Sequence, residues 1–283
     1  MTKASPATAA SLLRASPLDA VDARILLAHA LGWSRTQLIT RADAPLEAAA
    51  AARYLMLEAR RAAGEPVAQL VGSREFFGLA LEVTPDVLIP RPETELLVEA
   101  AFDALDGIAA PAVLDLGTGS GAVAIAIADG RPDARITALD RSAAALAVAR
   151  RNAARLLDGA RPGGAVTFLE SDWYAALDPA ARFHAIVSNP PYIARHDPHL
   201  DEGDLRFEPR GALTDEADGL AAIRAIVAGA GAFLLPRGEL WIEHGYDQAE
   251  AVRELLSQAG FDEVASLADL ASIERTTGGR LSG

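Results

Sequence analysis

A glycine-rich segment at residues 115–121 has the composition of a cofactor-binding loop and reads Asp-Leu-Gly-Thr-Gly-Ser-Gly. It follows an apolar stretch and precedes an alanine-rich one, a pattern typical of a strand that turns into a helix. Glycine lets the backbone turn sharply and lets a ligand approach without a Cβ in the way. In open α/β sheets the ligand lies beyond the carboxyl ends of the strands. We therefore expect a cofactor to contact Gly117, Thr118, Gly119, Ser120 and Gly121.

The glycine loop alone does not decide which cofactor binds. Gly117, Gly119 and Ala122 also fit the dinucleotide pattern G-x-G-x-x-A. Asp140, at the end of the next expected strand, would accept hydrogen bonds from the ribose of either NAD or S-adenosylmethionine. Asp115 favours S-adenosylmethionine, because an acid beside the loop suits the ammonium of a methionine moiety better than a pyrophosphate. A glycine turn that only packs the helix against the strand is the structural alternative.

A second motif, Asn189-Pro190-Pro191-Tyr192, follows the apolar residues 185–188. Two successive prolines fix two φ angles and remove two backbone donors. The Asn189 side-chain oxygen and the Pro190 carbonyl remain as acceptors. They can hold both hydrogens of a planar NH₂ group and aim its nitrogen at an electrophile, while Tyr192 stacks on the group. We expect Asn189, Pro190 and Tyr192 to be catalytic and the whole motif, with Pro191, to bind the substrate. A rigid turn after a strand is the structural alternative.

Together the two motifs indicate methyl transfer from S-adenosylmethionine to nitrogen. The cofactor supplies the methyl group on a sulfonium, so the protein has to position the acceptor and support its developing charge. The chain has no cysteine, which excludes thiolate metal sites and cysteine nucleophiles, and we expect no metal. The second motif does not separate a glutamine amide from the exocyclic amine of a base, because both are planar NH₂ groups.

The elements that carry these motifs alternate between strand and helix. Short apolar runs predict strands at residues 112–116, 135–139, 166–169, 185–188, 238–243, 264–267 and 273–277. Helical spacing predicts helices at residues 93–104, 122–128, 142–156, 220–234 and 248–258. The alternation predicts an α/β fold, in which a seven-stranded, mainly parallel, Rossmann-like sheet carries helices on both faces.

Residues 1–72 are expected to form a small helical domain. Ser16-Pro17 predicts a helix start, and Gly32 predicts its end. Between them the apolar residues at helical spacing are Leu18, Val21, Ile25, Ala28 and Leu31. A second long helix is expected from Pro45 through Arg61.

Residues 73–92 are expected to form a hairpin around Gly78 and a proline-rich linker, and residues 93–283 the catalytic domain. The net charge of −13 is unevenly distributed. Residues 1–75 carry nine Lys/Arg and seven Asp/Glu, whereas residues 76–283 carry seventeen and thirty-two. An acidic catalytic part would repel a long phosphate backbone, which counts against duplex DNA as the substrate.

The N-terminal residues lack the apolar run of a signal peptide, and no stretch of about 18 apolar residues predicts a membrane span. We expect a cytoplasmic protein. His196 and His199 are the two histidines that lie close together, and a solvated loop is the favoured interpretation for both.

The glycine loop resembles the first motif of the seven-stranded-sheet methyltransferases. The resemblance implies that Asp140 is the ribose-binding acid, with Arg141 beside it. It also implies that residues 171–173 surround the adenine, so that Asp172 binds the exocyclic amine and Trp173 covers the ring. An ordinary core aromatic is the alternative for Trp173.

Beyond these motifs the chain resembles the protein-glutamine methyltransferases that modify the Gly-Gly-Gln motif of peptide chain release factors. The matching segments are Gly64–Gly72, Phe76–Gly78, Val87–Glu95, Phe207–Leu213, Asp218–Leu220 and the ending from Asp269 to Arg280. The string Ile89-Pro-Arg-Pro-Glu-Thr-Glu95 is the most specific of these matches. One departure is Ser272, where a glycine is more usual. The resemblance implies that Asn189 contacts both the cofactor and the substrate glutamine.

Arg91 and Glu93 lie where the chain enters the catalytic domain, and we expect them to shape the substrate mouth. An ion pair with capping of the following helix is the alternative. The mildly basic N-terminal domain is expected to dock the release factor. We expect a monomer without stably bound nucleic acid and without membrane contact.

Three competing functions remain. A DNA or rRNA amino-methyltransferase would share the second motif but would need a basic groove or a recognition domain. A nicotinamide-dependent oxidoreductase would leave the second motif unexplained. A cofactor-binding scaffold would show no turnover.

Overall fold

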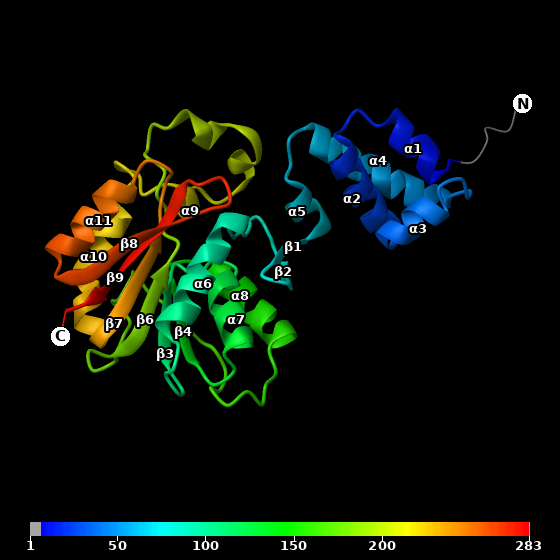
Figure 1. Ribbon diagram of the computed structural model, residues 1–283. Coiled ribbons are helices and arrows are strands. Elements are labelled where there is room, and N and C mark those ends of the chain that lie inside the picture. Colours follow the sequence, from blue (N-terminus) through cyan, green and yellow to red (C-terminus); the bar gives the residue numbers. More distant parts are fainter. Residues whose placement is uncertain (1–6, 283) are drawn as a thin grey trace, which may run out of the picture. The chain divides into compact units, whose positions relative to one another are not determined.

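The computed structural model describes residues 7–282. Its contacts divide the chain into two compact units, Met1–Ser73 and Arg74–Gly283. The colours of Figure 1 follow the sequence, so the first unit runs from blue to cyan and the second from cyan to red. No helix in residues 7–282 is both long and apolar enough to cross a membrane.

The described part of the first unit contains five helices. They are α1 (Ala9–Ala15), α2 (Ala20–Leu31), α3 (Arg35–Thr40), α4 (Ala48–Ala62) and α5 (Val67–Val71). Their shared core includes Leu26, Leu27, Tyr54 and Leu57. The two long helices were predicted from spacing, whereas α1, α3 and α5 are too short to show a period.

The sequence predicted the end of α2 correctly but its start wrongly. Gly32 ends the helix in the left-handed conformation, with φ 63°. The helix begins at Ala20 and not at Pro17. Asp19 caps the helix, because its side chain accepts a hydrogen bond from the Val21 N–H. Val21 and Ile25 are 59% and 43% exposed. Apolar residues lie on several sides of this helix, so their spacing did not identify the face that packs against the core.

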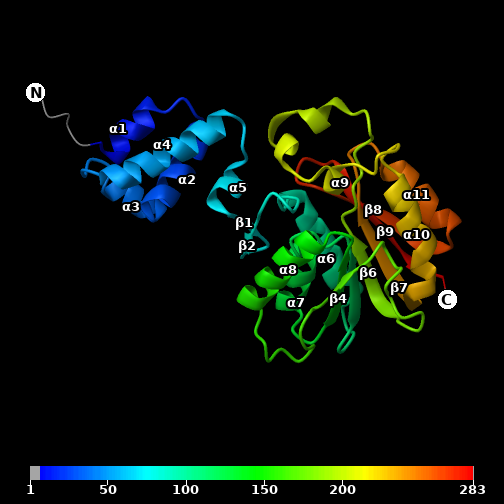
Figure 2. The same cartoon turned by 180° about the vertical axis from the view of Figure 1, so that it is seen from behind.

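The second unit is built on a seven-stranded sheet with the order β5-β4-β3-β6-β7-β9-β8. Figure 2 labels β4, β6, β7, β8 and β9 of this sheet. The strands are β3 (Ala112–Leu116), β4 (Arg135–Asp140), β5 (Thr167–Glu170), β6 (Phe183–Ser188), β7 (Leu234–Glu243), β8 (Phe261–Ala268) and β9 (Glu274–Leu281). Neighbouring strands are parallel from β5 to β7, and β9 is antiparallel to both β7 and β8. The predicted sheet is therefore confirmed.

Helices cover both faces of this sheet. The helices are α6 (Glu95–Ala104), α7 (Ala122–Gly130), α8 (Ala143–Leu156), α10 (Ala221–Phe233) and α11 (Ala249–Gln258). Val113 of β3 packs with α6 and α7 in one core cluster, whereas its neighbour Leu114 packs with α10 and α11 in the other. Successive strand residues point to opposite faces, so a continuous apolar strand such as β3 can supply both cores.

A hairpin precedes the sheet, formed by β1 (Ser73–Phe76) and β2 (Leu79–Glu82). Phe76 and Leu81 are buried in the same core cluster as α6 and α7. The hairpin expected around Gly78 is present, and its apolar side chains belong to the core of the second unit.

Four short helical elements lie in connecting segments of the second unit: η1 (Pro92–Thr94), η2 (Pro198–Asp201), η3 (Gly203–Phe207) and α9 (Arg210–Leu213). Residues 195–213 have no apolar period, so the sequence did not predict the three elements there. His196 and His199 are exposed in this segment, as expected.

Candidate active site

The two motifs lie side by side because they follow adjacent parallel strands. Leu116 at the end of β3 pairs with Ser188 at the end of β6. The glycine loop therefore starts beside Asn189, at the point where the order of the strands reverses. Ligands of open α/β sheets bind at this position.

The glycine loop adopts conformations that favour glycine. Gly117 and Gly119 have φ angles of 74° and 54°. A Cβ on Gly117 would lie 3.8 Å from the Asn189 carbonyl oxygen and 3.9 Å from the Trp173 ring. The loop is held against the sheet because the Gly117 and Thr118 N–H groups both donate to the Leu139 carbonyl, each at 2.9 Å. The backbone is thus open to a ligand on the side that faces Asn189 and Trp173.

Asp140 joins the loop to the start of α8. One carboxyl oxygen accepts the Gly119 N–H at 2.9 Å, and the other accepts the Ser142 N–H at 2.8 Å. Burial raises the pKa of Asp140, and the two N–H donors act in the opposite direction. A carboxylate oxygen can accept more than one hydrogen bond, so the ribose contact expected of Asp140 is compatible with this loop.

Asp115 acts on the loop rather than on the cavity. It is buried, and Thr118 Oγ1 donates to its Oδ2 at 2.6 Å. Burial raises the pKa of Asp115 to about 7. Asp115 could act on the ammonium of the methionine moiety directly or through a hydrogen-bonded loop, and its hydrogen bond with Thr118 fits the second route.

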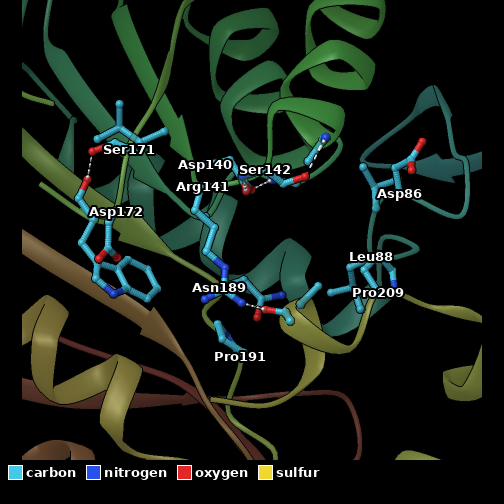
Figure 3. Close-up of a pocket in the computed structure, with 18 residues that line it drawn as sticks. Asp86, Leu88, Asp140, Arg141, Ser142, Ser171, Asp172, Asn189, Pro191 and Pro209 are labelled. Carbon is cyan, nitrogen blue, oxygen red and sulfur yellow. Dashed lines mark hydrogen bonds between the residues drawn. The ribbon is translucent and has the colours of Figure 1, made fainter. Parts of the chain in front are cut away.

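A cavity of about 280 Å³ lies beside the two motifs (Figure 3). The predicted site residues on its wall are Gly117, Gly119, Asp140, Arg141, Asp172, Trp173, Asn189 and Pro191. Two other segments contribute to the wall, with Asp86, Val87 and Leu88 before α6 and Pro209, Gly211 and Ala212 around α9. The remaining wall residues are Leu139, Ser142, Ala145 and Ser171. The predicted site residues outside this wall are Thr118, Ser120, Gly121, Pro190, Tyr192, Arg91 and Glu93.

Trp173 is placed against the glycine loop by an unusual backbone. Its φ angle is 46°, and its carbonyl accepts a hydrogen bond from the Ser171 hydroxyl at 2.7 Å. A positive φ in a bulky residue is uncommon and is maintained only when the surroundings enforce it. The ring packs partly against the core and partly lines the cavity, so its contact with the adenine stays a prediction.

The Asn-Pro-Pro-Tyr loop is anchored at both ends. The Asn189 Nδ2 group donates to Thr94 Oγ1 at 3.1 Å. The Tyr192 hydroxyl donates to Glu243 Oε1 at 3.3 Å, and its carbonyl accepts from Gln248 Nε2 at 3.0 Å. With its NH₂ group directed at Thr94, Asn189 has its side-chain oxygen left as an acceptor.

Thr94, Glu243 and Glu208 were not predicted as site residues from the sequence. Thr94 and Glu208 lie in two of the segments that resemble the family, Ile89–Glu95 and Phe207–Leu213. Glu243 is the last residue of a predicted strand. The three residues can be read in the sequence, but their contacts in the site depend on which strands are neighbours in the sheet.

Arg91 forms an ion pair rather than facing the cavity. It pairs with Glu208, which also accepts the Ile89 N–H at 2.9 Å. This carboxylate joins the segment before α6 to the segment around α9, and both segments line the cavity. Arg141, between β4 and α8, also contacts the segment around α9, because its Nη2 donates to the Gly211 carbonyl at 3.2 Å. Glu93 is half-buried.

Two family models match the chain: the PrmC N-terminal domain over residues 7–72 and the methyltransferase small domain over residues 92–203. The release factor glutamine methyltransferase of Burkholderia pseudomallei is 78% identical over 282 residues, covering 100% of this chain and 99% of the relative. The chain belongs to the release factor glutamine methyltransferase family. The predicted S-adenosylmethionine-dependent methyltransferase is thereby confirmed.

A second member of the release factor glutamine methyltransferase family, from Bordetella pertussis, is 58% identical and covers 95% of this chain and 98% of its own. A 16S rRNA methyltransferase from T. thermophilus, solved with AdoMet and guanosine, shares the fold. It has a TM-score of 0.52 and 23% identity, covering 74% of this chain and 49% of that one. Ser272, the departure from the family pattern, adopts a φ of 62°, a conformation in which a glycine would be less strained than a serine.

Proposed function

We propose that this chain transfers a methyl group from S-adenosylmethionine to the side-chain amide nitrogen of the glutamine in the Gly-Gly-Gln motif of peptide chain release factors. The observation that carries the proposal is the position of Asn189, which lies on the cavity wall beside Gly117. The family relationship supports the substrate, since the relatives are release factor glutamine methyltransferases.

The residues on the cavity wall fit the cofactor. The open face of Gly117 and Gly119 would receive the methionine part, Asp140 the ribose hydroxyls, and Asp172 with Trp173 the adenine. Arg141 would close the cavity from the side of α8. When bound, the cofactor supplies an electrophilic methyl group on sulfur.

The chain's own part is to hold the amide nitrogen of the substrate in line with that methyl group. The Asn189 Oδ1 and the Pro190 carbonyl would accept the two amide hydrogens, and Tyr192 with Pro191 would confine the planar group. In the transfer, an N–C bond would replace the C–S bond, which would leave S-adenosylhomocysteine, and one proton would pass from nitrogen to water. Acceptors around the nitrogen stabilise the positive charge that it develops.

Two further roles extend this proposal. Residues 1–72 dock the release factor, and residues 73–92 connect them to the catalytic residues 93–283. The enzyme acts as a monomer in the cytoplasm, without a stable complex with nucleic acid. Undiminished activity on intact release factor after deletion of residues 1–64 would refute the docking role.

The test of the proposed function compares three substrates. Intact release factor, rRNA and duplex DNA are incubated separately with the enzyme and labelled S-adenosylmethionine. We expect label in release factor alone, and no label when Asn189→Ala replaces the enzyme. Label in a nucleic acid but not in release factor would contradict the proposal.

A further inference from the structure

Gln248 occupies the N-cap position of α11, but its side chain forms no capping hydrogen bond with that helix. The side chain instead forms three hydrogen bonds with backbone groups outside α11. Its Oε1 accepts from the Gly245 N–H at 2.8 Å, and its Nε2 donates to the carbonyls of Tyr192 and Gly219 at 3.0 Å and 3.2 Å. Gln248 therefore joins the end of β7, the Asn-Pro-Pro-Tyr loop and the segment before α10.

The three partners fix the orientation of the Gln248 amide. A backbone N–H group can only donate and a carbonyl oxygen can only accept. The amide oxygen must therefore face Gly245, and the NH₂ group has one hydrogen for each of the two carbonyls. A glutamate of the same shape would offer the two carbonyls an acceptor in place of a donor, so this position requires an amide.

The peptide group between Tyr192 and Ile193 is held on both of its edges. This peptide bond is trans, so its carbonyl and its N–H group point in opposite directions. The Tyr192 carbonyl accepts from Gln248, and the Ile193 N–H donates to the Leu213 carbonyl at 3.0 Å. The two prolines before Tyr192 have no N–H group that could anchor the loop in this way. Because the Tyr192 Cα belongs to the held peptide group, the direction in which the ring leaves the chain is held with it.

Gly219 allows the contact because it has no side chain. It is buried and has a φ of 84°. A Cβ at this position would lie 2.5 Å from the Tyr192 carbonyl oxygen and 2.9 Å from Gln248 Nε2, which is inside the van der Waals contact distance. The Asp215 carboxylate holds the turn by accepting the Gly219 N–H at 3.0 Å. The segment Asp218–Leu220, which resembles the family, thus has a defined contact with the substrate loop.

We propose that Gln248 and Gly219 form a clamp on the Tyr192 carbonyl, which sets where the Tyr192 ring confines the substrate amide. The hydroxyl at the far end of the ring donates to Glu243 Oε1 at 3.3 Å, so the ring is held at both ends. Gln248 and Gly219 are positioning residues, since they act through Tyr192. The inference rests on the proposed function in one respect, namely that Tyr192 contacts the amide that is methylated.

The alternative role for Gln248 is to hold Gly245 at the end of β7. Gln248→Glu separates the two roles, because it keeps an oxygen for the Gly245 N–H and replaces the NH₂ donor by an oxygen that faces two carbonyls. The measurement is made at about pH 8, well above the ordinary pKa of a glutamate. A role limited to Gly245 predicts the wild-type kcat for this variant, whereas the clamp predicts a loss.

The kinetic test measures kcat and the KM for S-adenosylmethionine of the full-length enzyme on intact release factor. Gln248→Glu and Gly219→Ala should each lower kcat by at least about tenfold, because a displacement of about 1 Å near the reacting atoms can cost about 100-fold. The KM for S-adenosylmethionine should change less than about twofold, since neither residue lines the cavity. A smaller loss of kcat in either variant that binds S-adenosylhomocysteine would overturn the clamp. The two variants reach the Tyr192 carbonyl from different segments, so the test stands if one of them does not fold.

Each variant has a matched control. Gly260→Ala is the control for Gly219→Ala, because Gly260 has a φ of 85° and no atom within 4 Å of its Cβ position. Arg253→Ala is the control for Gln248→Glu, because Arg253 also lies on α11 but binds side chains of β8 and β9. Both controls should keep the wild-type kcat. Equal losses in the controls would show that the variants act through general destabilisation and would overturn the clamp.

A second readout does not depend on the substrate. The enzyme has four tyrosines, and in fluorotyrosine-labelled protein Tyr192→Phe assigns the fluorine NMR signal of Tyr192. This signal should move in Gln248→Glu and Gly219→Ala and stay in place in both controls. An unmoved signal in both variants would overturn the clamp even if the enzyme methylates release factor. If wild type methylates no release factor, the proposed function fails, while this spectrum still decides whether Gln248 and Gly219 hold the ring.

Discussion

Leu116 and Ser188 form a pair across the parallel strands β3 and β6, and the Ser188 hydroxyl donates to the Leu116 carbonyl at 2.7 Å. Each residue is the last of its strand, so the glycine loop and the Asn-Pro-Pro-Tyr loop start at the same level of the sheet. This pairing brings a cofactor loop and an acceptor-rich loop, 72 residues apart in the chain, to one cavity.

The open backbone at Gly117 is expected to be required for cofactor binding. Gly117→Ala places a Cβ near Asn189 and Trp173 and forces a residue with a side chain into a positive φ, at a cost of roughly 1–2 kcal/mol. Calorimetric titration with S-adenosylhomocysteine should show affinity weakened by about tenfold or more. Gly159→Ala, at a glycine with open space around its Cβ position, is the control and should bind as wild type does.

The carboxylate of Asp140 is expected to hold the glycine loop as well as the cofactor. Asp140→Ala removes the acceptor of two N–H groups, each bond to a charged group being worth about 1.5–3 kcal/mol. The KM for S-adenosylmethionine should rise by at least about tenfold, while the KM for release factor changes little. A matched substitution at the exposed Asp129 should change neither value. Equal KM values for Asp140→Ala and wild type would show that the loop does not depend on this carboxylate.

The Arg91–Glu208 pair is expected to stabilise the fold. Arg91→Ala leaves Glu208 buried without its cation, which should lower the free energy of unfolding by about 3 kcal/mol. Arg151→Ala breaks an exposed pair with Glu82 and should cost less than about 1 kcal/mol. Denaturant unfolding of the two variants measures the difference. Similar losses in both would mean that Arg91 does not stabilise the cavity walls, and its expected role at the substrate mouth would gain support.

Buried carboxyl groups should make the protein less stable as the pH rises from about 4.5 to about 7. Burial raises the pKa of both Glu243 and Asp115 to about 7. A group whose pKa is raised by folding contributes stability below its unfolded pKa and loses that contribution as the pH rises through its folded pKa. Around Glu243, Glu93 raises its pKa further and Arg275 lowers it.

The test of this pH dependence is the Glu243→Gln variant. Between about pH 5 and about pH 8, the thermal midpoint of the variant should fall less than the thermal midpoint of wild type. Asp115 still titrates in the variant, so a smaller decline should remain. Parallel curves for the two proteins would show that Glu243 does not titrate with a raised pKa.

The strands and the two motifs could be predicted because their signals are local. The apolar run at residues 112–116 coincides with β3, and the glycines at positions 117 and 119 mark the turn that follows. The buried face of α2 could not be predicted, since apolar residues lie on several of its sides.

The network behind Asn189 was hidden from the sequence for a different reason. Thr94 is 95 residues from Asn189 along the chain, and Glu243 is 51 residues from Tyr192. These contacts exist because η1 and the end of β7 reach the end of β6 in the folded sheet. Strand order decides this, and no local pattern in one sequence encodes it.

The most direct test of the account is mass spectrometry of release factor after incubation with the enzyme and S-adenosylmethionine. Peptides that contain the Gly-Gly-Gln motif should gain one methyl group, and fragmentation should place it on the glutamine side chain. Asn189→Ala, tested for unchanged S-adenosylhomocysteine binding, should leave the peptide unmodified. An unmethylated glutamine in the presence of enzyme that binds its cofactor, or a methyl group on another residue, would contradict the account.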